Sequence, residues 1–157
     1  NIHNSTVYRW NRPCYGISPN GRPHLRIENR ILPAGPTVAD EMANAGFWFG
    51  LMNGFEDVYP DITKRMDFDD AKSNFLRTAR TGLGAKYYWV DQQIIHDTEL
   101  IEKELLPIAR AGLEKANIDI GDIDYYLGII EERNRTSRTG SRWILESYGK
   151  LINSSLR

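Results

Sequence analysis

The sequence predicts an α+β fold, in which a short antiparallel pair of strands is followed by about five helices. Two segments, 5–12 and 24–32, are rich in Val, Ile, Tyr and Trp, as strands are. The run Ser18-Pro19-Asn20-Gly21 between them is a strong turn signal. Beyond residue 37, apolar residues recur at helical spacing. We therefore expect the strand pair first and helices over the remaining two thirds of the chain.

The first helix is predicted to begin at Thr37 and to run to about Gly54. Thr37 and Asp40 have the spacing of a capping box, and Pro33, Gly35 and Pro36 end the preceding strand. Apolar side chains recur along one face of this helix, and we expect that face to lie in the core: Val38, Met42, Ala45, Phe49 and Met52.

Four further helices are predicted. The second runs from about Asp69 to Arg80 and ends at Gly82. The third begins near Asp97 or Thr98, and Pro107 must kink or divide it. The fourth begins near Asp122. The apolar stripes of the last two helices are Ile123, Leu127 and Ile130, and Ile144, Tyr148 and Leu151.

Size and composition point to one domain, and we interpret residues 1–157 as a single unit. With 20 basic and 21 acidic residues the net charge is −1, so no overall field favours nucleic acid or a membrane surface as a partner. The single Cys14 excludes an intrachain disulfide, and no apolar run is long enough to span a membrane. A cytoplasmic location is the expectation.

A pair of strands rarely holds together without further strands or covering helices. Because the sequence starts at Asn1, directly before the first strand segment, we expect the missing strands to lie upstream. An incomplete sheet exposes strand edges, which makes association into a homo-oligomer plausible.

The second strand segment concentrates charge on one side. Arg26, Glu28 and Arg30 alternate with Leu25, Ile27 and Ile31, so the charged set projects one way and the apolar set the other, toward a core. Two arginines and a carboxylate suit an anionic ligand and a metal ion. Equally, the charges could face solvent and stabilise the neighbouring strand.

Each of the three charged residues is a candidate for chemistry. Glu28 could hold Mg²⁺, which prefers hard oxygen ligands and is often shared with phosphates. Arg30 could offer its planar fork of donors to a phosphate or carboxylate. Arg26 could bind a second anion or simply pair with Glu28.

Other polar patterns have both a functional and a structural interpretation. Arginines 133, 135, 138 and 142 could hold the phosphates of a nucleotide next to a helix N-terminus, or form a solvated turn. Glu102 and Glu104 lie in an amphipathic helix and are expected mainly in solvent. The run Tyr87-Tyr88-Trp89 is expected to pack between elements. The histidines and Cys14 lack the spacing of zinc ligands.

Several segments together resemble the glutamate–cysteine ligase family of carboxylate–amine ligases. The run from His24 to Thr37, HLRIENRILPAGPT, continued by ANAGFW at 43–48, is similar to the C-terminal half of that family's catalytic domain. The segments 3–13, 126–133 and 138–143 are similar to its preceding strand and its closing helices. The resemblance spans nearly the whole chain and implies that residues 1–157 are the C-terminal part of a ligase catalytic domain.

The resemblance implies a fold and a reaction. The family shares the glutamine synthetase fold, so the strand pair would belong to a larger sheet of that type. An ATP-dependent enzyme of glutathione biosynthesis phosphorylates a carboxylate to an acyl phosphate, which an amine then attacks. Its substrates would be small amino acids and ATP, with ATP and Mg²⁺ as cofactors.

The same resemblance implies a role for each of the site residues. Glu28 would ligate Mg²⁺, Arg30 would bind the γ-phosphoryl group or the substrate carboxylate, and Arg26 would join Arg30 as a catalytic residue. The residues assigned to cofactor binding are Arg9, Arg12 and Arg138.

One departure from the family matters. The N-terminal half of the catalytic domain, which supplies further carboxylates, is not in this sequence, and there is no Glu-x-Glu metal pair outside the amphipathic helix. The chain would therefore need that missing part as a partner and would be inactive alone. The alternative is a non-catalytic interaction or regulatory module that retains the ligase-like scaffold.

Overall fold

The computed structural model describes residues 11–32 and 35–155. The chain divides into two compact units, a hairpin unit up to Ala34 and a helical unit from Gly35 onward. The fold is α+β, with two small antiparallel strand pairs and a set of helices, which confirms the predicted class. The interpretation of residues 1–157 as a single unit stays a prediction.

The hairpin unit consists of β1 (Asn11–Ile17) and β2 (Pro23–Asn29), which pair in antiparallel register. The predicted turn is confirmed: the amide of Gly21 donates to the carbonyl of Ser18 at 2.8 Å, and Gly21 has a φ of +79°, which favours glycine. The first strand was predicted over 5–12. It extends five residues further, to Ile17, and residues 5–10 lie outside the described residues.

The two faces of the hairpin differ as the alternation predicted. One face carries the cross-strand pairs of Arg12 with Glu28 and of Cys14 with Arg26, while Tyr15 pairs with Leu25 on the other. The apolar face was expected to point toward a core. Leu25 is instead 80 % exposed and Ile27 49 % exposed, because a two-stranded ribbon has no second layer of its own to cover it.

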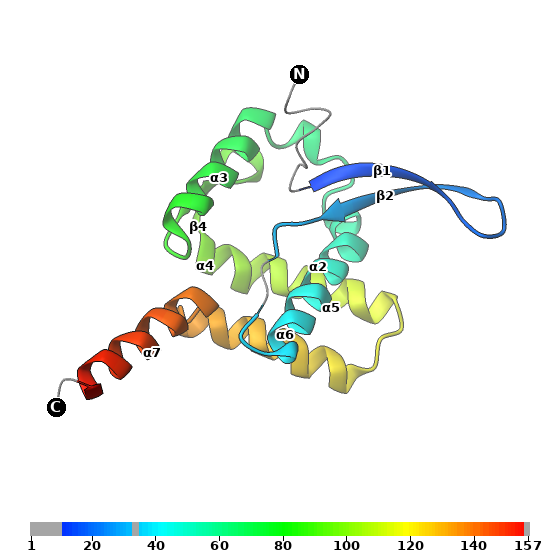
Figure 1. Cartoon of the computed structure of the whole chain (residues 1–157). Coiled ribbons are helices and arrows are strands. Elements are labelled where there is room, and N and C mark those ends of the chain that lie inside the picture. The colour runs from blue at the N-terminus through cyan, green and yellow to red at the C-terminus, as the bar shows by residue number, and fades with distance from the viewer. Residues whose placement is uncertain (1–10, 33–34, 156–157) are drawn as a thin grey trace, which may run out of the picture. The chain divides into compact units, whose positions relative to one another are not determined.

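The centre of the helical unit is formed by three helices (Figure 1), α2 (Val38–Val58), α5 (Leu106–Lys115) and α6 (Ile120–Thr136). As predicted, Thr37 caps α2 by accepting a hydrogen bond from the amide of Asp40. The predicted stripe of α6 is confirmed as buried. The cluster at this centre comprises Ala109, Leu113, Ile123 and Leu127, with Phe47, Leu51 and Leu106 packed against it.

Glycines decide which face of α2 packs against α5. A Cβ atom at Gly50 or Gly54 would collide with the backbone of α5, and one at Gly112 would lie 2.7 Å from the amide nitrogen of Gly54. The backbones of α2 and α5 are therefore in direct contact along this face. The apolar stripe predicted to lie in the core faces away and is largely exposed, with Val38 at 74 % and Phe49 at 60 %, so that prediction was wrong.

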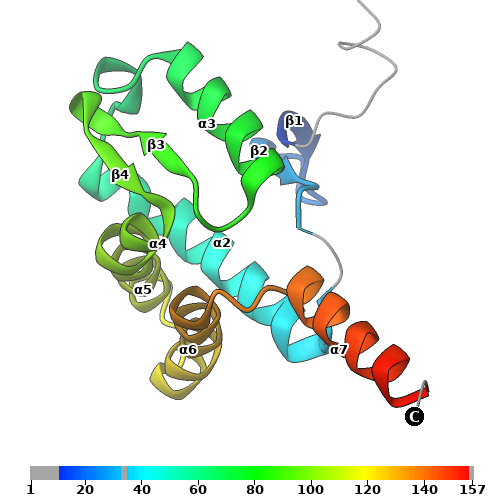
Figure 2. The same ribbon diagram turned by 90° about the vertical axis from the view of Figure 1, so that its left-hand side faces the viewer.

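A second layer of structure lies beside this centre (Figure 2). It contains the 3-10 turns η1 (Ile62–Lys64) and η2 (Val90–Gln92), helix α3 (Phe68–Thr81), and the strands β3 (Lys86–Tyr88) and β4 (Ile94–His96). Gly82 ends α3 as predicted. The strand pair β3–β4 was not predicted, since three-residue strands leave too short a pattern. The buried Asn74 of α3 joins the layer to β3 by bonding both the amide and the carbonyl of Tyr88.

One long helical segment links this layer to α5. It begins as α4 (Asp97–Leu100), continues through a π-helical turn η3 (Ile101–Leu105) and becomes α5. The start at Asp97 and a break in the helix near Pro107 were both predicted; the π-helical turn ends at Leu105, two residues before the proline, which lacks an amide donor.

The last helix, α7 (Gly140–Ser155), extends beyond the other helices of the unit in both views (Figures 1 and 2). Its predicted apolar stripe is exposed, with Ile144 at 59 %, Tyr148 at 63 % and Leu151 at 65 %. Among the residues that the structure describes, no helix is long and apolar enough to cross a membrane.

Candidate functional site

The predicted site residues Glu28 and Arg30 lie together on the charged face of the hairpin, joined by Arg12. Nη2 of Arg30 donates to Oε1 of Glu28 at 2.7 Å, and Nε of Arg12 donates to Oε2 at 2.5 Å. The Glu28 side chain is 30 % exposed, and Sγ of Cys14 lies 3.7 Å from Oε2. One carboxylate is thus held between two guanidinium groups contributed by both sides of the hairpin.

These contacts change the acidity of the carboxylate. The hydrogen bond from Arg30, followed by that from Arg12, lowers the pKa of Glu28 from 4.5 to about 2. Glu28 is therefore ionised at any physiological pH, which is the state required of a metal ligand and equally of a permanent ion-pair partner.

The described residues supply only part of a Mg²⁺ site. Mg²⁺ in proteins is usually bound by one or two carboxylates together with waters and substrate phosphates, and Glu28 is the carboxylate available on this face. No group of three or more His, Cys, Asp or Glu side chains that could hold a metal occurs within 11–32 and 35–155. A Mg²⁺ ion here would need further oxygen ligands from outside those residues, and it would compete with two arginines for Glu28.

The other hairpin candidates are placed differently. Nη1 of Arg26 lies 3.1 Å from Nε2 of His24, whose Nδ1 lies 3.2 Å from Oγ of Ser18. The structure therefore gives Arg26 a histidine neighbour, whereas the ion pair with Glu28 that the sequence allowed is formed by Arg12 and Arg30. Arg9 lies outside the described residues.

Arg138, assigned to the cofactor, lines a cavity of about 300 Å³ within the helical unit. We name this space the arginine cavity. It lies where the start of α2, the end of α6 and the start of α7 meet, and the lining side chains that matter for binding are Thr37, Asp40, Arg133, Arg138, Thr139 and Trp143.

A fixed ion pair forms one wall of the arginine cavity. Arg133 donates through Nη2 to Oδ1 of Asp40 at 3.0 Å and through Nη1 to Oδ1 of Asn44 at 2.6 Å. Both charged side chains are mostly buried, with exposed fractions of 21 % and 24 %. The hydroxyl of Thr37, and then Arg133, lower the pKa of Asp40. The sequence pointed to this arginine-rich segment but not to its partners on α2, which lie about ninety residues away in the chain.

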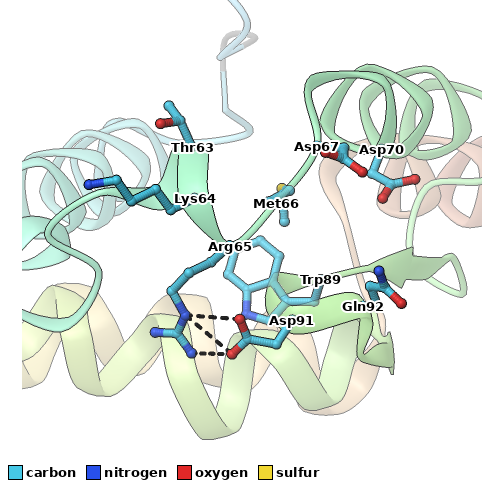
Figure 3. Close-up of a pocket in the computed structure, with 9 residues that line it drawn as sticks. All are labelled: Thr63, Lys64, Arg65, Met66, Asp67, Asp70, Trp89, Asp91 and Gln92. Atoms are coloured by element: carbon cyan, nitrogen blue, oxygen red, sulfur yellow. Dashed lines mark hydrogen bonds and ion pairs between the residues drawn. The ribbon is translucent and has the colours of Figure 1, made fainter.

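A second cavity, of about 290 Å³, lies between η1, the start of α3 and η2 (Figure 3). On one side, Arg65 forms a two-point ion pair with Asp91, with Nε of Arg65 at 3.1 Å from Oδ1. Asp91 and Gln92 both adopt left-handed backbone conformations, with φ of 54° and 61°, a conformation that is costly for residues other than glycine. No sequence motif predicts this pair, because its members are far apart in the chain.

Glu104 is a further polar residue whose environment differs from the one predicted from the sequence. It was expected mainly in solvent, but its Oε2 accepts hydrogen bonds from the hydroxyl of Tyr59 at 2.5 Å and from Nε1 of Trp89 at 2.8 Å. Tyr59 is buried, and the Trp89 ring packs edge to face against the rings of Phe55 and Tyr59. The expectation that the run Tyr87-Tyr88-Trp89 packs between elements is confirmed for Trp89, whose indole donates to Glu104, whereas Tyr88 is 39 % exposed.

No family model, no curated protein and no solved structure matches the chain.

Proposed function

We propose that this chain is the C-terminal part of an ATP- and Mg²⁺-dependent carboxylate–amine ligase resembling glutamate–cysteine ligase. The observation that carries the proposal is the charged face of the hairpin, where Glu28 lies between Arg12 and Arg30. It supports the proposal because the segment HLRIENR, from His24 to Arg30, is also the core of the family resemblance. The substrates would be small amino acids and ATP, and the location cytoplasmic.

In the proposed reaction a substrate carboxylate oxygen attacks the γ-phosphorus of ATP. The bond to the β,γ-bridging oxygen breaks, and ADP leaves. The amine then attacks the acyl carbon, releases phosphate and loses a proton, which forms the amide. Mg²⁺, when bound, supplies charge neutralisation on the phosphates. Arg30 and Arg26 would bind and orient the anionic groups, and Arg9, Arg12 and Arg138 would contribute to ATP binding.

A second function is favoured by the same geometry. Glu28 is already neutralised by two guanidinium groups, so the three side chains can act as a structural ion cluster. A chain of this kind would be a non-catalytic interaction or regulatory module on a ligase-like scaffold. Metal-dependent ATP binding separates the two functions, because only the ligase requires Glu28 as a metal ligand.

Substitution of Arg30 by Lys tests the ligase directly. Lysine keeps the positive charge but loses the planar fork that binds a phosphate or carboxylate through two hydrogen bonds. The full-length protein is incubated with ATP, Mg²⁺ and candidate amino acids. We expect Arg30→Lys to lower the rate of ADP release at least about tenfold, which corresponds to an activation free energy higher by about 1.4 kcal/mol. An undiminished rate would show that the guanidinium group of Arg30 has no role in the reaction.

A further inference from the structure

The arginine cavity has the charge of an anion site. It contains two guanidinium groups, from Arg133 and Arg138, and one carboxylate, from Asp40. Asp40 is paired with Arg133, and Glu146, which does not line the cavity, lies 3.8 Å from Arg138 and 3.9 Å from Arg142. Three arginines against two carboxylates leave one excess positive charge beside the cavity. A ligand with a single negative charge would balance this set.

Both arginines have donors for a ligand. Arg133 is held in one orientation by Asp40 and Asn44 through its two terminal nitrogens, and a guanidinium has five N–H groups, so further donors remain. Arg138 lies 3.8 Å from the carboxylate of Glu146, beyond hydrogen-bonding distance, and its side chain is 54 % exposed. One arginine is thus fixed, and the other can close on an oxyanion.

An aromatic surface and a small volume complete the site. The indole of Trp143 lines the cavity and is 44 % exposed, so a flat ring can stack on it. The volume of about 300 Å³ is at the lower end of the range for small-molecule pockets, about 300 to 1,000 Å³. The space suits a single ring with one substituent.

We propose that the arginine cavity binds a small molecule in which one oxyanion, a carboxylate or a phosphate monoester, is carried on a flat ring. The oxyanion lies against Arg138 and Arg133, and the ring lies on Trp143. The site goes beyond the proposed ligase reaction, and Arg138 is the one residue that the two share.

The test is a titration of the full-length protein followed by NMR and calorimetry. The probes are benzoate, phenyl phosphate, acetate, inorganic phosphate and the neutral benzyl alcohol. Benzoate and phenyl phosphate should saturate and bind about 2- to 10-fold more tightly than acetate and phosphate, as ring stacking predicts, while benzyl alcohol should bind more weakly than benzoate. The better of the two aromatic anions identifies the preferred oxyanion.

Variants locate the site. Arg138→Ala should weaken benzoate at least about fivefold, and Trp143→Leu should remove the preference for benzoate over acetate. Arg135→Ala is the matched control, since Arg135 is an exposed arginine of the same segment that bonds Glu132 and does not line the cavity; it should leave the affinity unchanged. Circular dichroism of each variant checks that the helices are intact.

Two results would overturn the inference: no saturable binding of either aromatic anion, or an equal loss of affinity in Arg138→Ala and Arg135→Ala. The binding proposal for the cavity and the ligase proposal can be rejected independently of each other. Absent benzoate binding counts only against the cavity, and ATP–Mg²⁺ affinity that does not depend on Glu28 counts only against the ligase.

Discussion

Among the described residues of the hairpin, Glu28 has the most strongly shifted pKa. Hydrogen bonds from Arg30 and Arg12 lower its pKa from 4.5 to about 2. A lowered pKa in the folded state means that the ion cluster stabilises the hairpin fully above pH 4.5, and that this contribution is lost as the pH falls from 4.5 through about 2.

The first prediction concerns this titration. In wild-type protein, the side-chain carboxyl carbon of Glu28, followed by NMR, should titrate with a midpoint near pH 2. Replacing Arg30 by Ala removes the larger cause, so the midpoint should rise toward 4.5. A wild-type midpoint near 4.5 would show that the two arginines do not hold the carboxylate in solution.

Glu104 supports a second prediction at this scale. Glu104→Ala leaves the hydroxyl of Tyr59 and the indole N–H of Trp89 without their acceptor, and an unsatisfied buried donor costs about 1 to 3 kcal/mol. We expect the free energy of unfolding, measured with urea, to fall by that amount. Glu102→Ala, in the same helical segment but exposed, should change it by less than about 0.5 kcal/mol; equal effects of the two substitutions would argue against a structural role for Glu104.

At the scale of the element, the close contact of α2 with α5 depends on glycine. The three glycines Gly50, Gly54 and Gly112 bring the two backbones together, which places large side chains on the remaining faces. Periodicity alone could not predict this. It assigned the large apolar residues of α2 to the core, because a helix that is apolar on several sides does not reveal which side a partner helix will approach. For α6, where apolar side chains form one stripe, the prediction was confirmed.

The third prediction tests the glycine contact. Gly112→Ala puts a methyl group against the backbone of Gly50 and Gly54 and should destabilise the protein by about 1 to 3 kcal/mol or more through overpacking. Gly128→Ala on α6 has no atom within 4 Å of the added Cβ and should be neutral or stabilising by up to about 1 kcal/mol. The stability of both variants is measured by thermal or urea unfolding. A Gly112→Ala variant as stable as the wild type would mean that α2 and α5 do not approach so closely.

At the scale of the whole molecule, the chain is a hairpin unit and a helical unit. The sequence predicted the hairpin turn, the cap of α2, the start at Asp97 and the stripe of α6, since each rests on local chemistry. It missed the Arg133–Asp40 pair, the Arg65–Asp91 pair and the acceptor role of Glu104, since each depends on contacts between distant segments. The charged trio of the hairpin was partly foreseen: Glu28 and Arg30 were expected on one face, and Arg12 joined them from the opposite strand.

The fourth prediction follows from the location of the core. Both buried clusters of the described structure consist of residues between Phe47 and Leu127, so residues 35–157 contain all of them. This fragment, expressed alone, should keep its helical circular dichroism and unfold cooperatively. A fragment without a cooperative transition would show that the helical unit depends on the hairpin.

Isothermal titration calorimetry of ATP–Mg²⁺ binding to the full-length protein, with and without the Glu28 side chain, decides between the ligase and the non-catalytic module. The proposed ligase predicts binding by the wild type and a loss of at least about tenfold, or 1.4 kcal/mol, in Glu28→Ala, with no change in the control Glu131→Ala, an exposed acid on α6. An affinity that is the same in all three proteins would contradict the metal role of Glu28 and favour the non-catalytic module.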